Sequence, residues 1–153
     1  LSEFTGAISA YVRYGNIETA MPYSASGTIA YYENGAPARV VVDNDGRVDG
    51  APIAATHLPA MDCTEQAALA NSSWEIINNG AVRLTRNIRV TRMKLVGENA
   101  RLLLNGKTLK VESLQIDDVT FNPGIYASTD LPTNVEGEGN VEVMISSTLI
   151  ILK

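Results

Sequence analysis

The residues able to do acid–base or metal chemistry are few, and the single histidine limits them most. His57 is the only histidine in the 153 residues, which excludes a zinc site built on two histidines. A serine triad would have to use His57, and no Gly-x-Ser-x-Gly elbow is present to hold its nucleophile. The one cysteine, Cys63, has no basic neighbour in the sequence that would activate its thiol. We therefore expect no catalytic triad and no metal centre.

Paired carboxylates are the other chemistry to consider, because glycoside hydrolysis uses two of them. Asp117 and Asp118 are adjacent, so on a strand they point to opposite faces and do not converge. Glu136 and Glu138 can share a face, but they alternate with glycines in an expected loop. The stretch DNDG at 43–46 lacks the later ligands of an EF-hand and is expected to stabilise a turn. The sequence predicts a non-enzymatic protein with no cofactor.

Binding is better supported, because eight of the chain's 12 bases lie in one run: Arg83, Arg86, Arg89, Arg92, Lys94, Arg101, Lys107 and Lys110. Five candidate ligand-binding residues are expected to project outward from strands: Arg83, Arg89, Lys94, Arg101 and Lys110. Stacked strands lie about 4.8 Å apart, so these side chains can form a cationic ladder for an anionic polysaccharide or an acidic partner. The alternative is a solvated face whose charge prevents edge-to-edge aggregation.

The elements that position these bases are short strands between residues 79 and 126. Apolar residues alternate with polar ones there, which indicates one buried face. The expected inward residues are Val82, Leu84, Ile88, Val90, Met93, Leu95, Leu102, Leu104, Leu109, Val111, Leu114 and Ile116. Asn79-Gly80, Gly97 and Asn105-Gly106 separate the strands as turns. Many short strands with no helix between them are typical of an all-β sandwich, barrel or solenoid.

Length and charge restrict the class further. We expect a single β domain over residues 1–153, with a less regular β-element in 1–60 and stacked strands with a closing segment in 72–145. The net charge of -5 argues against general nucleic-acid binding. No apolar run is long enough to span a membrane. There is no starting methionine or signal segment, so we expect a mature protein or a fragment.

An ordered series of motifs follows residue 72: Asn105-Gly106, Thr108-Leu109-Lys110-Val111, Gly124-Ile125-Tyr126, Leu131-Pro132 and Gly137-Glu138-Gly139 before a last apolar strand. Residues 72–145 therefore resemble the closing segment of bacterial autotransporter passengers and related secreted parallel β-helix proteins. The chain departs from that family in being richer in arginine and lysine. The resemblance implies a right-handed parallel β-helix and a secreted or cell-surface setting in a bacterium, but no activity.

The expected fold is therefore all-β, as a right-handed parallel β-helix (solenoid) that can carry a small antiparallel element at its N-terminus. A β-sandwich is the alternative. The expected function is structural or adhesive, with a polysaccharide or a cell-surface molecule as partner. Two other functions stay open. One is a carbohydrate-binding accessory module of a polysaccharide-active enzyme. The other is a self-assembling fibre or surface-layer subunit, joined through the ends of the solenoid.

Overall fold

The computed structural model describes residues 27–33, 36–44, 46, 55–58 and 70–145, and these contain strands and one short 3-10 helix. This confirms the all-β expectation. The strands are β1 (Gly27–Glu33), β2 (Ala36–Asp43), β3 (Thr56–Leu58), β4 (Ser73–Ile77), β5 (Ala81–Leu84), β6 (Ile88–Leu95), β7 (Arg101–Leu103), β8 (Lys107–Ile116), β9 (Val119–Thr120), β10 (Gly124–Ala127), β11 (Val135–Glu136) and β12 (Gly139–Val143). The 3-10 helix η1 is Ser128–Asp130. The prediction for Cys63 lies outside the described residues.

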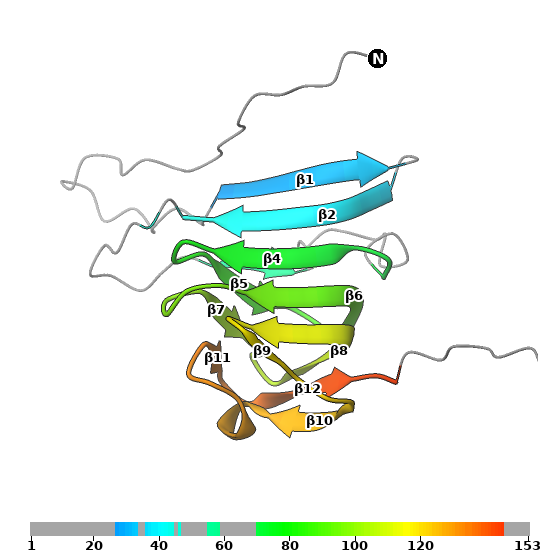
Figure 1. Cartoon of the computed structure of the whole chain (residues 1–153), viewed down its shortest axis with the longest axis vertical. Coiled ribbons are helices and arrows are strands. Elements are labelled where there is room, and N and C mark those ends of the chain that lie inside the picture. The colour runs from blue at the N-terminus through cyan, green and yellow to red at the C-terminus, as the bar shows by residue number, and fades with distance from the viewer. Residues whose placement is uncertain (1–26, 34–35, 45, 47–54, 59–69, 146–153) are drawn as a thin grey trace, which may run out of the picture.

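The strands form two sheets, and the chain passes from one to the other between successive strands. The larger sheet has the order β1-β2-β4-β6-β8-β12-β10, with β9 beside β8, and the smaller has the order β11-β7-β5-β3. Because β5 and β7 lie in the smaller sheet, β4, β6 and β8 run in the same direction and pair in parallel. Figure 1 shows the strands of the larger sheet one above another, with the smaller sheet behind them.

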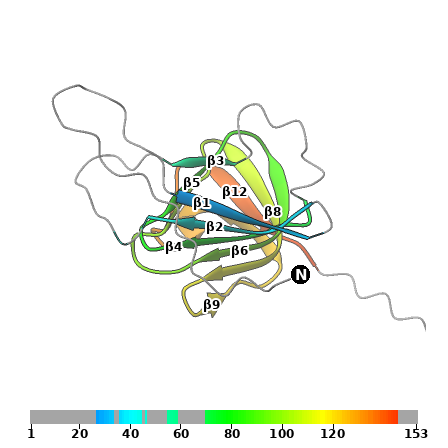
Figure 2. The same ribbon diagram turned by 90° about the horizontal axis from the view of Figure 1, so that it is seen from above.

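β6 and β8 bend at equivalent positions. Their pairing runs from Ile88 and Leu109 to Val90 and Val111, and resumes at Arg92 and Ser113. β4 pairs only with the second half of β6, and β12 pairs only with the first half of β8. The larger sheet is therefore divided between two columns of strands, and the smaller sheet supplies a third. The strands surround a common interior when viewed from above (Figure 2).

We call these columns A, B and C. Column A contains β2, β4 and the second halves of β6 and β8, with β1 and β9 at its edges. Column B contains the first halves of β6 and β8, followed by β12 and β10. Column C contains β3, β5, β7 and β11. From β4 to β8 the chain passes through columns A, C and B in turn, and we call each such passage a circuit.

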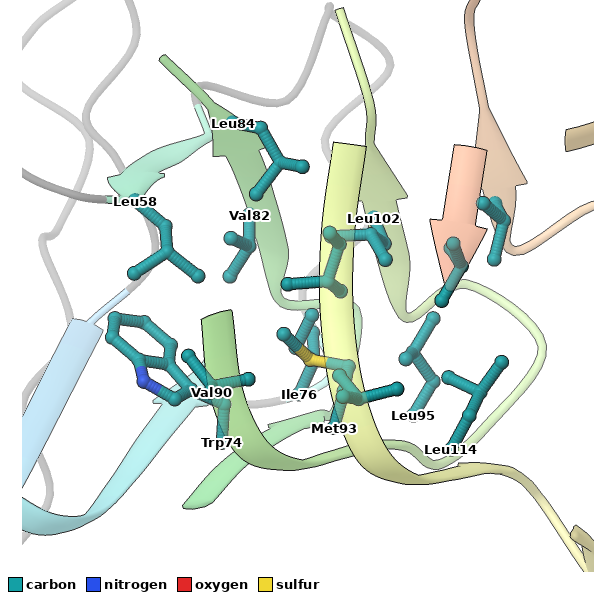
Figure 3. Close-up of a cluster of buried hydrophobic side chains, with 14 of the residues drawn as sticks. Leu58, Trp74, Ile76, Val82, Leu84, Val90, Met93, Leu95, Leu102 and Leu114 are labelled. Carbon is teal, nitrogen blue, oxygen red and sulfur yellow. The ribbon is translucent and has the colours of Figure 1, made fainter. Parts of the chain in front are cut away.

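The interior is built from apolar residues at equivalent positions in successive circuits. The in-register rows are Trp74–Met93–Leu114 in column A, Ile88–Leu109–Val141 in column B and Val82–Leu102–Val135 in column C. Every residue expected to point inward between 82 and 116 is buried, so that prediction is confirmed. Figure 3 shows side chains from the three columns meeting in this core. Burial of these side chains is the main favourable term holding the columns together.

The corners between columns depend on asparagine. Asn78, Asn79 and Asn105 have positive φ angles of 48°, 64° and 53°, a region that asparagine tolerates better than most residues. The Asn79 amide donates to the Gly46 carbonyl oxygen at 2.8 Å, and the Asn105 amide donates to that of Leu84 at 3.2 Å. These bonds link corners of neighbouring circuits. They also confirm turns at two of the predicted positions, Asn79-Gly80 and Asn105-Gly106.

Asn134 is one of two buried polar residues in the described part of the chain. Its side-chain amide donates to the carbonyl oxygens of Gly97 at 3.0 Å and Ala100 at 2.9 Å, with a longer bond of 3.3 Å to Glu98. The backbone carbonyl of Asn134 accepts from the amide of Leu102 at 2.8 Å. Asn134 therefore closes the turn before β7 and joins it to the circuit that contains β11.

Columns A and B have antiparallel edge strands. β1 pairs antiparallel with β2, in the region where the sequence allows an antiparallel element. β10 pairs antiparallel with β12, and β9 with β8. The last of the closing motifs lie near β10 and β12, at the bottom of Figure 1. There Tyr126 packs against the core and Leu131 is buried. The rings of Phe121 and Tyr126 meet edge-on with centroids 5.5 Å apart.

The inward and outward positions of β7 provide a test of this core. Leu102→Ala removes a fully buried side chain between Val82 and Val135, so the expected loss in the free energy of unfolding is about 2–5 kcal/mol. Leu103→Ala, on the outward side of the same strand, is the matched control and is expected to cost less than about 1 kcal/mol. Urea denaturation measures both. Equal losses would contradict the assignment of the two faces.

Asn134 provides a second test. Asn134→Ala leaves carbonyl oxygens of the Gly97–Ala100 turn without their donor, at an expected cost of about 1–3 kcal/mol. Asn134→Asp is expected to be worse at neutral pH, because an ionised carboxylate only accepts and would face these oxygens. The exposed Asn140→Ala is the control. The role is refuted if urea denaturation gives Asn134→Asp the stability of the unsubstituted chain.

Candidate functional site

The five predicted binding bases lie on three different columns. Arg89 and Lys110 are register neighbours in column B, and Lys94 lies in column A. Arg83 on β5 and Arg101 on β7 lie in column C, where Arg83 pairs with Leu103 rather than with Arg101. The structure therefore brings Arg89 and Lys110 together but does not align all five in one row. Each of these side chains is exposed or half-exposed, as the alternation predicts.

Four of the five bases are held by carboxylates on neighbouring strands. Arg89 Nη2 lies 2.8 Å from Glu112 Oε1, and Lys110 Nζ lies 2.8 Å from Glu142 Oε2. The Lys94 ammonium lies 3.6 Å from Glu75 Oε1, and Arg101 pairs with Glu136. Each pair joins two circuits. The outward surface therefore combines bases with acids and differs from a purely cationic ladder.

Glu75 on β4 is the centre of the largest of these groups. Its Oε2 accepts from Arg39 Nη2 at 2.7 Å, while its Oε1 faces Lys94 on the other side. The Arg39 guanidinium also lies 5.4 Å from the centre of the Tyr31 ring, a cation–π distance. The group spans β1, β2, β4 and β6 in column A. The sequence did not indicate Arg39 as a candidate, because it lies far from the basic run. Its outward direction could be predicted from strand alternation, since the neighbouring Val40 is apolar and buried.

The remaining chemical candidates occupy turns or edges. Asp117 has a φ of 49° and its Oδ1 accepts from the Gly97 amide at 2.7 Å, so this carboxylate stabilises a turn. Glu136 is engaged by Arg101, whereas Glu138 is exposed. His57 lies on β3 in register with Arg83 and is exposed. In the described ranges no three His, Cys, Asp or Glu residues gather to hold a metal ion, and no helix there has the length and apolarity to cross a membrane.

The Glu75 group gives a prediction on stability. Glu75→Gln is expected to cost about 0.5–1 kcal/mol at low salt, because these partly exposed pairs are screened by solvent, and less at high salt. Glu98→Gln removes an exposed acid without an ion pair among the described residues and is the charge-matched control. Urea denaturation at two salt concentrations measures both. A cost that does not change with salt, or that Glu98→Gln shares, would argue against an electrostatic link between β2, β4 and β6.

No protein-family model matches the chain, and neither the curated proteins nor the solved structures yield a match. The resemblance to autotransporter passengers thus rests on the motifs in the sequence. The architecture rests on the strand pairing described above.

Proposed function

We propose that this chain is a β-solenoid of the parallel β-helix type that acts outside the bacterial cell as a structural and adhesive element. The observation that carries the proposal is the in-register stacking of outward side chains across successive circuits. Arg89, Lys110 and Glu142 form one such row along column B. A row of this kind gives an extended surface, which is what adhesion to a long polymer or a cell surface uses.

The spacing of the circuits supports a solenoid. Trp74, Met93 and Leu114 occupy equivalent positions, and so do Val90 and Val111. These positions recur about every 20 residues, which is within the range of repeat proteins that contribute one structural unit per repeat. Each unit buries its apolar side only by stacking on its neighbours, as the rows in the three columns do.

The use of the carboxylates supports a structural role. Glu75, Glu112, Glu136 and Glu142 each bind a base on an adjacent strand. A general acid or nucleophile needs its carboxylate directed at a substrate, whereas these are directed at the protein itself. The extracellular setting is supported by the sequence motifs shared with secreted β-helix proteins, from Asn105-Gly106 to the Gly137-Glu138-Gly139 turn.

A binding panel tests the proposal. The chain is applied to immobilised cellulose, xylan, polygalacturonate, heparin and bacterial cell-wall material, with an unrelated acidic protein of similar net charge as the control. We expect saturable retention on at least one surface and no sustained release of reducing sugar or unsaturated uronate. Continued turnover would contradict the non-enzymatic role, and a lack of retention on every surface would contradict adhesion.

A further inference from the structure

The corner between β5 and β6 lies beside the corner that precedes β8. The amide of Asn105 donates to the Leu84 carbonyl oxygen at 3.2 Å, and the backbone amide of Thr108 donates to Asn87 Oδ1 at 2.9 Å. Two bonds therefore hold these corners together, one at each side of the junction between columns C and B. The positions that they bring side by side include Arg86 and Lys107.

These two bases stand at the same distance from a paired position. Ile88 pairs with Leu109, Arg86 lies two residues before Ile88 in the approach to β6, and Lys107 lies two residues before Leu109 on β8. Arg83 lies on β5 immediately before Leu84, whose carbonyl oxygen accepts one of the two corner bonds. The side chain of Arg83 is exposed. We call Arg83, Arg86 and Lys107 the basic corner.

The basic corner differs from most of the other described bases in its partners. Arg89, Lys94, Arg101 and Lys110 all bind carboxylates. Arg92 also makes no ion pair in the described part of the chain, but it lies in column A between Ser73 and Ser113. Within the part of the chain that the structure describes, Arg83, Arg86 and Lys107 make no ion pair. A base that is already paired must give up its partner before it binds an anionic ligand, whereas an unpaired one keeps its full charge for that ligand.

Among the described residues, one acid lies close to this group. The Gly106 amide donates to the backbone oxygen of Glu138 at 2.6 Å, and Gly139 pairs with Lys107, so exposed Glu138 is beside the corner. His57 adjoins Arg83 on β3. Within the described ranges, three bases beside this one carboxylate give a local excess of positive charge, on a chain whose net charge is -5. Such an excess attracts an anion to this corner.

We propose that the basic corner binds a linear polysaccharide through its sulfate or carboxylate groups. The inference rests on the proposed adhesive function and names the ligand class of that function. Guanidinium groups at Arg83 and Arg86 can bind these anions with two parallel hydrogen bonds, and Lys107 adds a point charge. Because Arg86 and Lys107 belong to successive circuits, neighbouring anionic groups on one polymer can be bound at the same time.

Two triple variants with the same change in charge test the corner. The first is Arg83→Gln, Arg86→Gln and Lys107→Gln, and the second, Arg39→Gln, Lys94→Gln and Arg101→Gln, removes three paired bases outside the row of Arg89 and Lys110. Binding of heparin and of polygalacturonate is measured by titration at low and high salt, since the first presents sulfates and the second presents carboxylates. We expect the first variant to lose at least roughly tenfold in affinity for the preferred polymer and the second less than about threefold. Binding should weaken as salt increases.

The outcomes separate the corner from the wider proposal. An equal loss in both variants, or unchanged binding in the first, would refute the basic corner, as would failure of the unsubstituted chain to bind either anionic polymer. If the basic corner is refuted in one of these ways, retention on cellulose, xylan or cell-wall material would still support the proposed adhesive function. Unfolding midpoints of both variants are compared first. If the first variant is destabilised, Arg86→Gln alone is used, with Arg39→Gln as its control.

Discussion

Backbone hydrogen bonding between parallel strands of successive circuits is the constraint on which the other features depend. It sets β4, β6 and β8 in a single register, so that Trp74, Met93 and Leu114 meet inside while Glu75 and Lys94 meet outside. A slip of one residue would exchange these faces, placing charges in the core and apolar side chains in water. The apolar rows and the ion pairs thus favour the same register for independent reasons. That agreement is a mark of a sequence that specifies one structure.

The corners make this ladder possible, because three columns can close around a core only if the chain turns sharply between them. Asparagine contributes to these turns in two ways. The backbones of Asn79 and Asn105 adopt positive φ angles, and their side chains donate hydrogen bonds to the preceding circuit. Gly139 has a φ of 127° and packs against the backbone of Lys107, a position that a side chain would obstruct. The carbonyl oxygens of Gly46 and Leu84 are thus hydrogen-bonded by the corner of the next circuit.

The sequence allowed the inward face to be predicted, because period-two alternation depends only on local chain geometry. Val82, Leu104 and Leu114 are buried as that alternation indicates, and the Asn-Gly pairs at 79–80 and 105–106 form turns. The outward chemistry was not predictable in the same way. Lys110 forms an ion pair with Glu142, and Arg101 forms one with Glu136. The number of residues between the two partners of each pair depends on the lengths of the intervening turns. Alternation predicts that a base points outward, but only the register between circuits determines which acid lies beside it.

The reversed strands at the column edges affect how far the side-chain rows can extend. In columns A and B, translation from one circuit to the next reproduces each row, and this repetition stops where β1, β9 and β10 run in the opposite direction. Beyond such a strand, hydrogen-bonding groups are spaced for an antiparallel pattern, so a further parallel circuit would not inherit the same alignment. Within the described residues, column C instead ends in the short strands β3 and β11, which offer few bonds. The direction of β1, β9 and β10 therefore ends the parallel periodicity at three of the described column edges.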